Sequence, residues 1–521
     1  MILRLRETVG PGRCWRCAPW TVVASKMALA ALLAFPVRAS GQDAAPAMEQ
    51  PPQAAAAENA ASPASPAVPA TEAPALEASR DAELIAAVAA KAPGLLADYI
   101  AVDTTNPPGN EIAGARFIAS VLEAEGIETR IFESEPGRGN LYARLKGNGS
   151  KRPLILLSHI DVVPVDRKRW SHQPYGGTVE EDGRLYGRGA LDAKGVGVVQ
   201  LLGVVALKRL GRSLDRDVIL LATADEETGG RLGAGWMVEN HLELFEDAEF
   251  VLNEGGFILR SENMPLIYNV DAAEKGPCWF RIIASGTPGH GSRPASQTAV
   301  TRLIHALSTL LSWQRPLEVG PVVAGYFAAY AALDTEHARQ LRQLGRSLED
   351  EAFRSWFMQQ PAWAALVSDT LAPNVLVGSV KTNIVPAQAM AEVDSRLLPG
   401  HSCDDFLAEV AKLVAGEHLR VEPTEVSFPS SQSPLDSELT MALERLAASD
   451  GEKAVVLPGL LSGFTDSHYF REKGMAAYGF VPLAISDRQR GSIHAPDENV
   501  GADELVAAVV RMVRLLEELG G

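Results

Sequence analysis

Short runs of continuously apolar residues alternate with helical patterns in the first half of the chain. The runs are NLYARLKG (140–147), PLILLSHI (153–160), DVILLATADEE (217–227) and EFVLNEGG (249–256), and a helical pattern, VGVVQLLGVVALKRL (196–210), separates the second run from the third. Strands that are apolar on both faces must be covered by helices on both sides of their sheet. The pattern therefore predicts an α/β domain with a mixed sheet, whose functional site lies at the carboxyl ends of the strands.

A second pattern begins near Gly276. Segments typical of strands and helices follow in the order β-α-β-β-α-β, at 278–285, 296–313, 374–398 (two strands), 404–416 and 419–428. This is the order of a ferredoxin-like unit. A helical segment at roughly 314–372 interrupts it, and the first pattern returns near Gln432. We therefore predict a catalytic domain in two parts, 81–275 and 431–521, with a small lid or dimerisation domain, 276–430, inserted between them.

The first 80 residues do not have the pattern of a folded domain. Basic residues precede the apolar run MALAALLAFP (27–36), and VRA (37–39) fits a signal-peptidase site, so we interpret 1–39 as a signal peptide. Residues 40–80 are rich in Ala, Pro and Glu, which predicts a disordered linker. We expect export to the periplasm or the exterior, with membrane anchoring by an uncleaved leader as the minor alternative. Cys278 and Cys403 either pair in such an oxidising compartment or remain two buried thiols.

The charge of the chain excludes two classes of partner. The formal net charge is -17, and basic residues are concentrated in the leader, so the remaining chain is more acidic still. Nucleic acids and anionic membrane surfaces are bound by clustered Lys and Arg. We therefore expect neither of them as a partner of the mature chain.

Histidine and acidic residues lie where the apolar runs end and in the loops beside them. These candidates are His159, Asp161, Asp192, Glu226, Glu227, Glu254 and His494. Taken alone, each carboxylate could equally be a helix cap or a solvated loop residue, and each histidine a structural residue. Together, two histidines and three carboxylates match the nitrogen and oxygen ligands that a pair of zinc ions needs.

The ligands divide evenly between two ions if Asp192 bridges them. His159 and Glu254 then complete one set, and Glu227 and His494 complete the other. Zinc accepts both imidazole nitrogen and carboxylate oxygen, and a catalytic site leaves one position for water. The sequence therefore predicts a two-metal catalytic centre rather than a structural zinc site.

Two acidic residues are left over in this assignment, and each has a task beside the metals. Asp161 would accept a hydrogen bond from the second ring nitrogen of His159 and so fix the tautomer of that ring. Glu226 would remain uncoordinated, where it can take a proton from the attacking water. We therefore expect Glu226 to be the general base.

Five motifs occur in a characteristic order: SHIDVVPV, WSHQPYGGTVEEDGRLYGRGALDAKG, ADEETGG, NEGG and IHAPDE. In order and context they resemble the co-catalytic zinc exopeptidase and amidohydrolase family that includes carboxypeptidase S, aminoacylase, glutamate carboxypeptidase and succinyl-diaminopimelate desuccinylase. The resemblance covers about residues 82–521. DTTNPPGNE (103–111) and NEGGFIL (253–259) are most similar to the carboxypeptidase S branch, which includes secreted N-fatty-acyl-amino-acid hydrolases.

The resemblance implies a zinc-exopeptidase-like catalytic domain, two Zn²⁺ ions for which Co²⁺ or Mn²⁺ can substitute, and the same roles for the seven residues named above. It also implies a cis peptide bond after Asp192. The chain departs from the family pattern at two positions. Ser158 stands where the family more often has Gly, and Ala193 stands where it often has an acidic, polar or Met residue. Neither change removes a ligand.

The resemblance further implies roles for three residues of the small domain. His290 in SGTPGHGSRP matches a histidine that hydrogen-bonds the oxyanion, typically in the active site of the partner subunit, which implies a homodimer. Asn383 and Arg396 match positions that contact the carbonyl and the free carboxylate of the substrate, and an Arg fork can bind both carboxylate oxygens. The alternatives are turn residues for His290 and Asn383 and a surface ion pair for Arg396.

The sequence therefore predicts a dizinc hydrolase of an amide bond next to a free carboxylate, acting on a small molecule or short peptide. Two substrate classes stay open: short peptides, as for a carboxypeptidase or dipeptidase, and N-acyl amino acids. Aromatic residues of 313–363 either form an apolar tunnel for an acyl chain or pack the helices together. The rival interpretations are a non-catalytic binding or receptor domain on a protease-like fold and a single-zinc aminopeptidase, which the context of Arg396 disfavours.

Overall fold

The computed structural model describes residues 73–334, 336–451 and 453–520, which lie within one compact unit, Val68–Gly521. The predicted signal peptide, 1–39, and the predicted linker as far as residue 72 lie outside the described residues. A helix, α1 (Ala73–Ala89), begins inside the segment for which the sequence predicts a linker.

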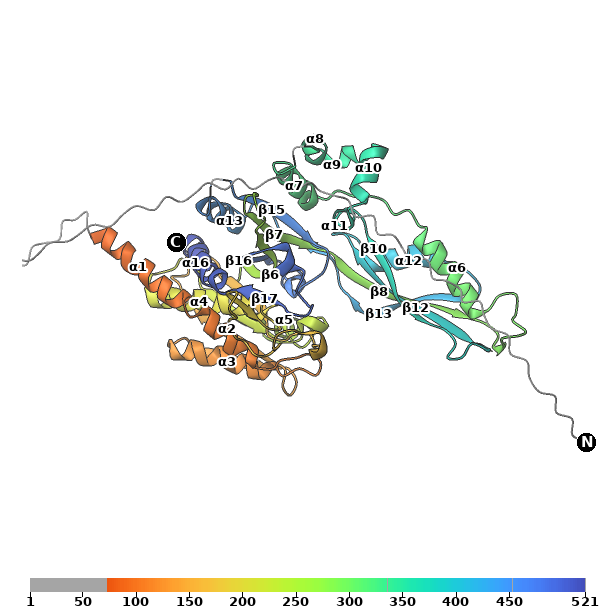
Figure 1. Cartoon of the computed structure of the whole chain (residues 1–521), viewed down its shortest axis with the longest axis horizontal. Coiled ribbons are helices and arrows are strands. Elements are labelled where there is room, and N and C mark those ends of the chain that lie inside the picture. The colour runs from red at the N-terminus through yellow and green to blue at the C-terminus, as the bar shows by residue number, and fades with distance from the viewer. Residues whose placement is uncertain (1–72, 335, 452, 521) are drawn as a thin grey trace, which may run out of the picture. The chain divides into compact units, whose positions relative to one another are not determined.

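In the described part of the chain, nine strands form a large mixed sheet (Figure 1). They are β1 (Thr129–Glu133), β2 (Gly139–Leu145), β5 (Val218–Thr223), β3 (Leu154–His159), β6 (Phe250–Leu259), β16 (Ala476–Ile485), β7 (Ile267–Glu274) and β14 (Ser431–Gln432) in spatial order, with β15 (Val455–Leu461) paired to β7. The four central strands, β5, β3, β6 and β16, run parallel, whereas β1 and β2 form an antiparallel edge. The predicted α/β fold with a mixed sheet is confirmed.

The central position of β3, with an apolar core on each face of the sheet, explains why its sequence is continuously apolar. Leu154 and Leu156 belong to one apolar core and Ile155 and Leu157 to another, on the opposite face of the sheet. Successive side chains of a strand point to opposite faces, so a strand covered on both sides needs an apolar residue at every position. All four side chains are fully buried.

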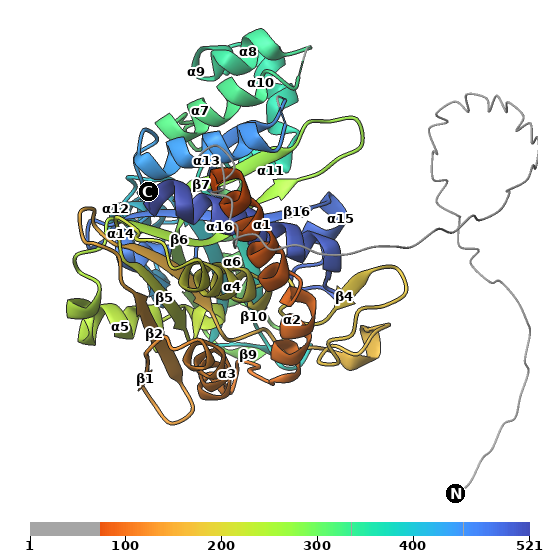
Figure 2. The ribbon, with the colours of Figure 1, turned by 90° about the vertical axis from the view of Figure 1, so that its left-hand side faces the viewer.

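Helices cover both faces of the large sheet. Beside α1, the first face carries α2 (Ala92–Ala101), α3 (Glu111–Ala124), α4 (Lys194–Leu210), α13 (Glu438–Ser449) and α16 (Ala502–Gly520), and the second carries α5 (Ala234–Asn240) and α14 (Ser467–Arg471). Figure 2 shows α1, α4 and α16 side by side, and these three helices contact one another. Among the described residues one stretch, Ala78–Ala101, is long and apolar enough to cross a membrane by length and composition alone. A turn at Ala90 and Lys91 interrupts it, and its two helices pack on α4 and α16.

A second, four-stranded sheet forms the small domain. Its strands lie in the order β10 (Thr370–Val377), β12 (Gln388–Leu397), β8 (Gly276–Ser285) and β13 (Leu419–Ser427), and its helices are α6 (Ala299–Leu311) and α12 (Cys403–Leu413). Along the chain these elements follow the β-α-β-β-α-β order expected from the sequence. Cys278 on β8 and Cys403 at the start of α12 form a disulfide, with their Cα atoms 5.5 Å apart.

The inserted helices pack on the large sheet. They are α7 (Pro321–Tyr330), α8 (Ala338–Arg342), α9 (Leu344–Ser347), α10 (Glu351–Met358) and α11 (Pro361–Ala364). Helix α7 contacts β15, and its residues Val322, Val323 and Phe327 belong to the apolar core of that sheet. Most aromatic residues of the insertion contact one another; Phe327, for example, packs against Phe357 with tilted rings and against Trp363 edge to face. Helix packing therefore accounts for them without an acyl tunnel.

Candidate metal centre

The five predicted ligands lie on or directly after three adjacent strands and in loops beside them. His159 is the last residue of β3, Glu254 lies within β6, and Glu227 lies in a short 3-10 helix, Glu226–Thr228, that follows β5. Asp192 directly precedes Ala193 at the start of α4, and His494 lies in the loop before β17 (Asn499–Gly501). Because β3, β5 and β6 are parallel, their carboxyl ends meet at one edge of the sheet.

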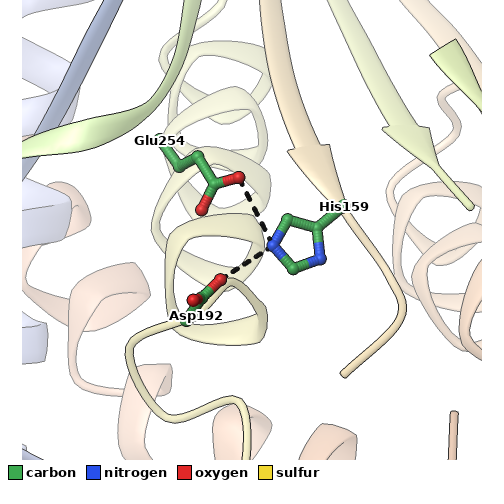
Figure 3. A group of neighbouring side chains, drawn as sticks. All are labelled: His159, Asp192 and Glu254. Carbon is green, nitrogen blue, oxygen red and sulfur yellow. Dashed lines mark hydrogen bonds and ion pairs between the residues drawn. The ribbon is translucent and has the colours of Figure 1, made fainter. Parts of the chain in front are cut away.

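His159, Asp192 and Glu254 form the first group (Figure 3). Nε2 of His159 lies 2.8 Å from Oδ1 of Asp192 and 3.4 Å from Oε1 of Glu254. The other ring nitrogen, Nδ1, donates a hydrogen bond to the backbone carbonyl of Asp161 at 2.9 Å. A carbonyl can only accept, so the proton of the neutral ring lies on Nδ1 and the lone pair of Nε2 points at the two carboxylates.

His494, Asp192 and Glu227 form the second group. Nε2 of His494 lies 3.1 Å from Oδ2 of Asp192 and 3.1 Å from each carboxylate oxygen of Glu227. Asp192 therefore turns one oxygen toward each histidine, and within each group the ligand atoms lie within 4.8 Å of one another. The structure gathers the residues in the two groups that the sequence suggests, with Asp192 in both.

The charges of the two groups fit a bound cation. Burial raises the pKa of Glu254 to about 7, with a further contribution from the charge of Asp192 and against the opposing effect of His159. Hydrogen bonds with Asp192 and Glu227 raise the pKa of His494 to about 10. Carboxylates this crowded repel one another unless positive charge lies between them. Imidazole and carboxylate donors are the set that zinc takes in catalytic sites, so the residues present fit such an ion.

Glu226 lies beside the groups without belonging to either of them. It is partly buried, and burial together with the charge of Glu254 raises the pKa of its carboxyl well above the usual value. Asp225, in the left-handed conformation at φ 73°, turns the chain from β5 into the short helix that carries Glu226 and Glu227. The arrangement places a carboxyl of raised proton affinity next to the candidate ligands.

The carboxylate of Asp161 holds the turn that carries Glu226 and Glu227. It accepts the backbone N–H of Glu226 at 3.1 Å and that of Glu227 at 3.2 Å, and the side-chain amide of Asn106 at 2.8 Å. Its Oδ1 is 3.5 Å from Nδ1 of His159, farther than the carbonyl of the same residue. Asp161 therefore orients His159 mainly through its backbone and the acidic turn through its side chain. Asn106 belongs to the DTTNPPGNE motif, to which the sequence assigned no role.

His290 and Asn383 lie together on an exposed two-stranded ribbon of the small domain. Strands β9 (Gly289–His290) and β11 (Ile384–Val385) pair, and the N–H of Gly291 donates to the carbonyl of Asn383 at 2.8 Å. Among the described residues, neither His290 nor Asn383 forms a hydrogen bond or ion pair with a member of the two metal groups. Their predicted roles at the substrate stay predictions.

Arg396 contacts a loop of the larger domain. Its guanidinium lies between the rings of Trp279 and Phe464, 5.3 and 5.0 Å from their centroids, and forms two hydrogen bonds with Asp394. Phe464 precedes Thr465, whose hydroxyl accepts a hydrogen bond from Asn253, the neighbour of Glu254. Arg396 is thus linked to the candidate centre through one loop.

Two buried residues lie beside the ligands: Arg188, whose motif is recognisable in the sequence without a clear catalytic task, and Glu498, which the sequence did not single out. Arg188 donates to Glu498 at 2.6 Å, and Glu498 also accepts the backbone N–H of Asp192 at 3.1 Å. They lie in the same short motifs as Asp192 and His494, which is the signal that could have drawn attention to them. The Asp192–Ala193 peptide bond is cis, as the family resemblance implies.

Comparisons with known proteins agree with this architecture. The model of Peptidase family M20/M25/M40 matches residues 155–518. Aminoacylase-1 of Mus musculus is 26% identical over 431 residues, covering 82% of this chain and 94% of that protein. The N-fatty-acyl-amino acid synthase/hydrolase PM20D1 of Xenopus tropicalis is 28% identical over 388 residues, covering 73% and 75%.

Solved structures share the fold at low identity. The M20 family metallo-carboxypeptidase Sso-CP2 from Sulfolobus solfataricus superposes with a TM-score of 0.65 at 20% identity, covering 81% of this chain and 98% of that one. Human carnosine dipeptidase 1 superposes with a TM-score of 0.62 at 14% identity, covering 84% and 98%. At these identities the likenesses show a shared fold.

Proposed function

The chain belongs to peptidase family M20/M25/M40 and is a metal-dependent hydrolase, and from this premise we propose that it hydrolyses the amide bond of N-acyl amino acids. One observation carries the proposal: two groups of metal ligands share Asp192, and an uncoordinated acidic residue, Glu226, lies beside them. Such a pair of sites with a free carboxyl supports hydrolysis better than binding alone.

The ligand groups would hold two zinc ions, with Co²⁺ or Mn²⁺ as substitutes. Each group offers one imidazole nitrogen, one terminal carboxylate and one oxygen of Asp192. When bound, the ions would polarise the carbonyl of the scissile amide and bring the pKa of a water molecule toward neutrality. The division of ligands leaves room at each site for an exchangeable position.

Glu226 would act as the single general acid and base. Its carboxylate takes the proton of the attacking water and later delivers that proton to the leaving nitrogen. The raised pKa of this partly buried carboxyl favours retention of the proton between the two transfers. The Asp161 carboxylate keeps Glu226 in place through the backbone N–H of that residue.

The small domain would bind the substrate and the developing oxyanion. Ser292 donates its backbone N–H to Nδ1 of His290 at 3.1 Å, so in the neutral ring the proton lies on Nε2, which is then a donor. A donor aimed at an oxyanion contributes about 3–4 kcal/mol to transition-state stabilisation. Asn383 would contact the substrate carbonyl, and Arg396 would bind the free carboxylate through the part of its guanidinium that Asp394 leaves open.

We place His290 in the active site of a second copy of the chain. Strand β10 is one of the two edges of the small sheet, and Val375, Leu376 and Val377 on it are 41%, 66% and 50% exposed. An exposed apolar edge strand is a template for pairing with another chain. A two-fold homodimer through β10 would cover this edge on both copies.

The relatives favour N-acyl amino acids over dipeptides as substrates. The two relatives described above that are similar in sequence, at 26% and 28% identity, are an aminoacylase and an N-fatty-acyl-amino acid synthase/hydrolase. The two peptidases described above are similar in structure, at 20% sequence identity or less. Short acyl chains are favoured over long ones, because the aromatic residues of the insertion fill its own core. The dipeptidase or carboxypeptidase function is the second candidate.

We also propose that the mature chain is exported. The basic and apolar leader of 1–39 has the composition of a signal peptide. The disulfide between Cys278 and Cys403 is of the kind that persists in oxidising compartments such as the periplasm or the exterior.

The decisive experiment measures amine release by the zinc-loaded chain, residues 73–521, on a matched panel of dipeptides and N-acyl amino acids of increasing acyl length. We expect turnover to be highest for short N-acyl amino acids. Glu226→Gln should retain both metal ions and lose turnover by at least about 10²–10⁴-fold, because it removes the proton carrier.

Each other outcome has a definite meaning. Preference for dipeptides would replace our substrate class with the second candidate. Preference for long acyl chains would support the hypothesis that the aromatic residues of 313–363 form a tunnel for an acyl chain, against our interpretation of their packing. Full activity in Glu226→Gln would end the proposed mechanism, and no turnover on either class with two zinc ions bound would leave the metal centre but remove the substrate class.

A further inference from the structure

Two of the candidate ligands lie in loops. Of the other three, His159 and Glu254 lie in strands, and Glu227 lies in the short helix that follows β5. Asp192 lies between β4 (Arg184–Tyr186) and α4, and His494 lies between α15 (Asp487–Arg490) and β17. His494 has φ 60°, a left-handed conformation that is strained for a residue with a side chain, and its side chain is half exposed. Something outside these loops must therefore keep the two ligands in register with each other.

Glu498 holds the loop of Asp192. Its carboxylate is fully buried and accepts the backbone N–H groups of Leu191 at 2.8 Å, Asp192 at 3.1 Å and Gly189 at 3.3 Å. Three N–H groups directed at one carboxylate fix the path of the chain immediately before and at the shared ligand. The backbone carbonyl of Glu498 in turn accepts the N–H of Gly187 at 2.9 Å.

Arg188 joins the same carboxylate to the loop of His494. Its Nη1 donates to Glu498 at 2.6 Å, and its Nη2 donates to the backbone carbonyl of His494 at 3.2 Å. The guanidinium is buried and lies over the ring of Trp170, 5.3 Å from the ring centroid. One buried ion pair thus contacts the backbone of both loop ligands, which are some three hundred residues apart in sequence.

We propose that Arg188 and Glu498 form a positioning clamp that sets Asp192 and His494 at the distance needed to hold the metal ion of the second group. The inference rests on the proposed function, because it assumes that the second group binds an ion. The first group depends less on the clamp, since His159 and Glu254 are placed by the hydrogen-bonded strands β3 and β6. Loss of the clamp should therefore release one ion and not both.

Glu498→Gln is the most informative variant. One oxygen of the new amide can still accept the N–H groups of Leu191 and Asp192, so the loop of the shared ligand keeps most of its support. The amide nitrogen would face Nη1 of Arg188 and Gly189 N–H, donor against donor, which displaces the guanidinium. The carbonyl of His494 then loses its partner, and this ligand is the one most affected.

The test titrates metal-free protein with Zn²⁺ by calorimetry, counts bound zinc after dialysis, and records the visible absorption of the Co²⁺-loaded form. We expect two ions per wild-type chain. Glu498→Gln should bind the first ion with wild-type affinity and the second about 10–100-fold more weakly, as for other residues that orient metal ligands. The Co²⁺ spectrum should lose the contribution of one site only.

Glu438→Gln is the matched control. Glu438 also pairs with a buried arginine, Arg216 at 2.7 Å, but Arg216 precedes β5 and so lies at the end of that strand opposite Glu226. It should bind two ions like the wild type, whatever its effect on stability. Arg188→Lys provides a second variant that keeps a positive charge for Glu498 but cannot reach both of its acceptors at once.

The outcomes separate the clamp from the proposed function. Two ions bound with unchanged affinity in folded Glu498→Gln and Arg188→Lys would overturn the clamp and leave the metal centre intact. Fewer than two ions in the wild type would overturn the proposed function itself. If neither variant folds while Glu438→Gln does, the pair serves the fold rather than the ligands, and the inference is wrong.

Discussion

At the scale of single residues, Asp161 connects the two halves of the candidate site. Its backbone carbonyl fixes the tautomer of His159, and its carboxylate accepts the N–H groups of Glu226 and Glu227. Asn106 donates to the same carboxylate and so completes its set of partners. A shift of this side chain would move the proposed proton carrier and one ligand together.

We predict that Asp161→Asn weakens catalysis more than its small change in shape suggests. An amide can accept at one atom only, and its NH₂ group must face at least one of the three donors that now point at the carboxylate. We expect kcat/KM to fall by about 10–100-fold. Steady-state kinetics on the preferred substrate measure the effect.

Asp166→Asn is the control for this prediction. Asp166 also caps a short 3-10 helix, by accepting the N–H of Lys168 at 3.1 Å, but this bond is exposed. Its replacement should leave kcat/KM unchanged. Equal kinetics for Asp161→Asn and the wild type would show that the three hydrogen bonds do not position Glu226.

Sequence reasoning could suggest the ligand groups because they follow from strand order. Neighbouring parallel strands bring His159, Glu227 and Glu254 together, although β6 continues beyond Glu254 to Leu259, and their residue types indicate metal. The pairing of Arg188 with Glu498 could not be predicted in this way. It depends on the contact between β4 and β17, and strands of three residues carry no detectable alternation.

At the scale of elements, the inserted helices change how the two sheets are joined. The chain leaves the large sheet at Lys275, returns to it with α7, leaves again after α11, and returns at β14. The segments that cross are hydrogen-bonded to one another; for example, Glu318 N–H donates to Val367 O at 2.8 Å. Helix α10 has an apolar face by periodicity and α7 is apolar throughout, but neither pattern says which surface the helix covers. That the inserted helices pack on the large sheet is therefore visible only in the structure.

Lys275 is the charged residue at the centre of this junction. It is buried between β7 and β8, and its Nζ donates to the carbonyls of Ser368 at 2.8 Å and Ala365 at 3.0 Å. Burial lowers the pKa of Lys275 to about 7 from its usual value of 10.5, although the charge of Asp369 opposes the shift. The ammonium is therefore held in the junction at a cost in stability.

We predict that this cost disappears as the pH rises. Between pH 7 and 10.5 the unfolded chain keeps the proton on Lys275 while the folded chain releases it, so the free energy of unfolding increases with pH over that window. The wild type should therefore gain stability relative to Lys275→Met by at most about 1.4 kcal/mol per pH unit from pH 7 to 10, and nothing below pH 6. Urea denaturation of both proteins at several pH values measures the difference.

Thr370→Val is the matched variant for the junction. It removes the third partner of Nζ, the Thr370 hydroxyl at 3.4 Å, and leaves the titrating lysine in place. Its stability relative to the wild type should stay constant across the same pH range. If the difference between the wild type and Lys275→Met also stays constant, the pKa of Lys275 is the same in the folded and the unfolded chain, and the prediction is wrong.

At the scale of the whole molecule, the proposed dimer relates the small domain of one copy to the active site of the other. The exposed residues Leu376 and Val380, 66% and 100% exposed, lie on and beside the edge strand β10. His290 lies on the exposed ribbon of β9 and β11 in the same small domain. If the copies pair through β10, catalysis by one copy requires a residue of the other, and no single chain holds a complete site.

A mixture of two inactive variants tests this arrangement. Glu226→Gln lacks the proton carrier and His290→Ala lacks the oxyanion donor, so each homodimer should be nearly inactive. In a mixed dimer, one of the two sites combines an intact Glu226 with His290 from the other copy. Random exchange of subunits should therefore restore about a quarter of the wild-type turnover. Leu376→Lys introduced into both variants places a charge on the pairing edge and should abolish the recovery. No recovery in a mixture whose heterodimers are verified by mass would assign His290 to the site of its own chain.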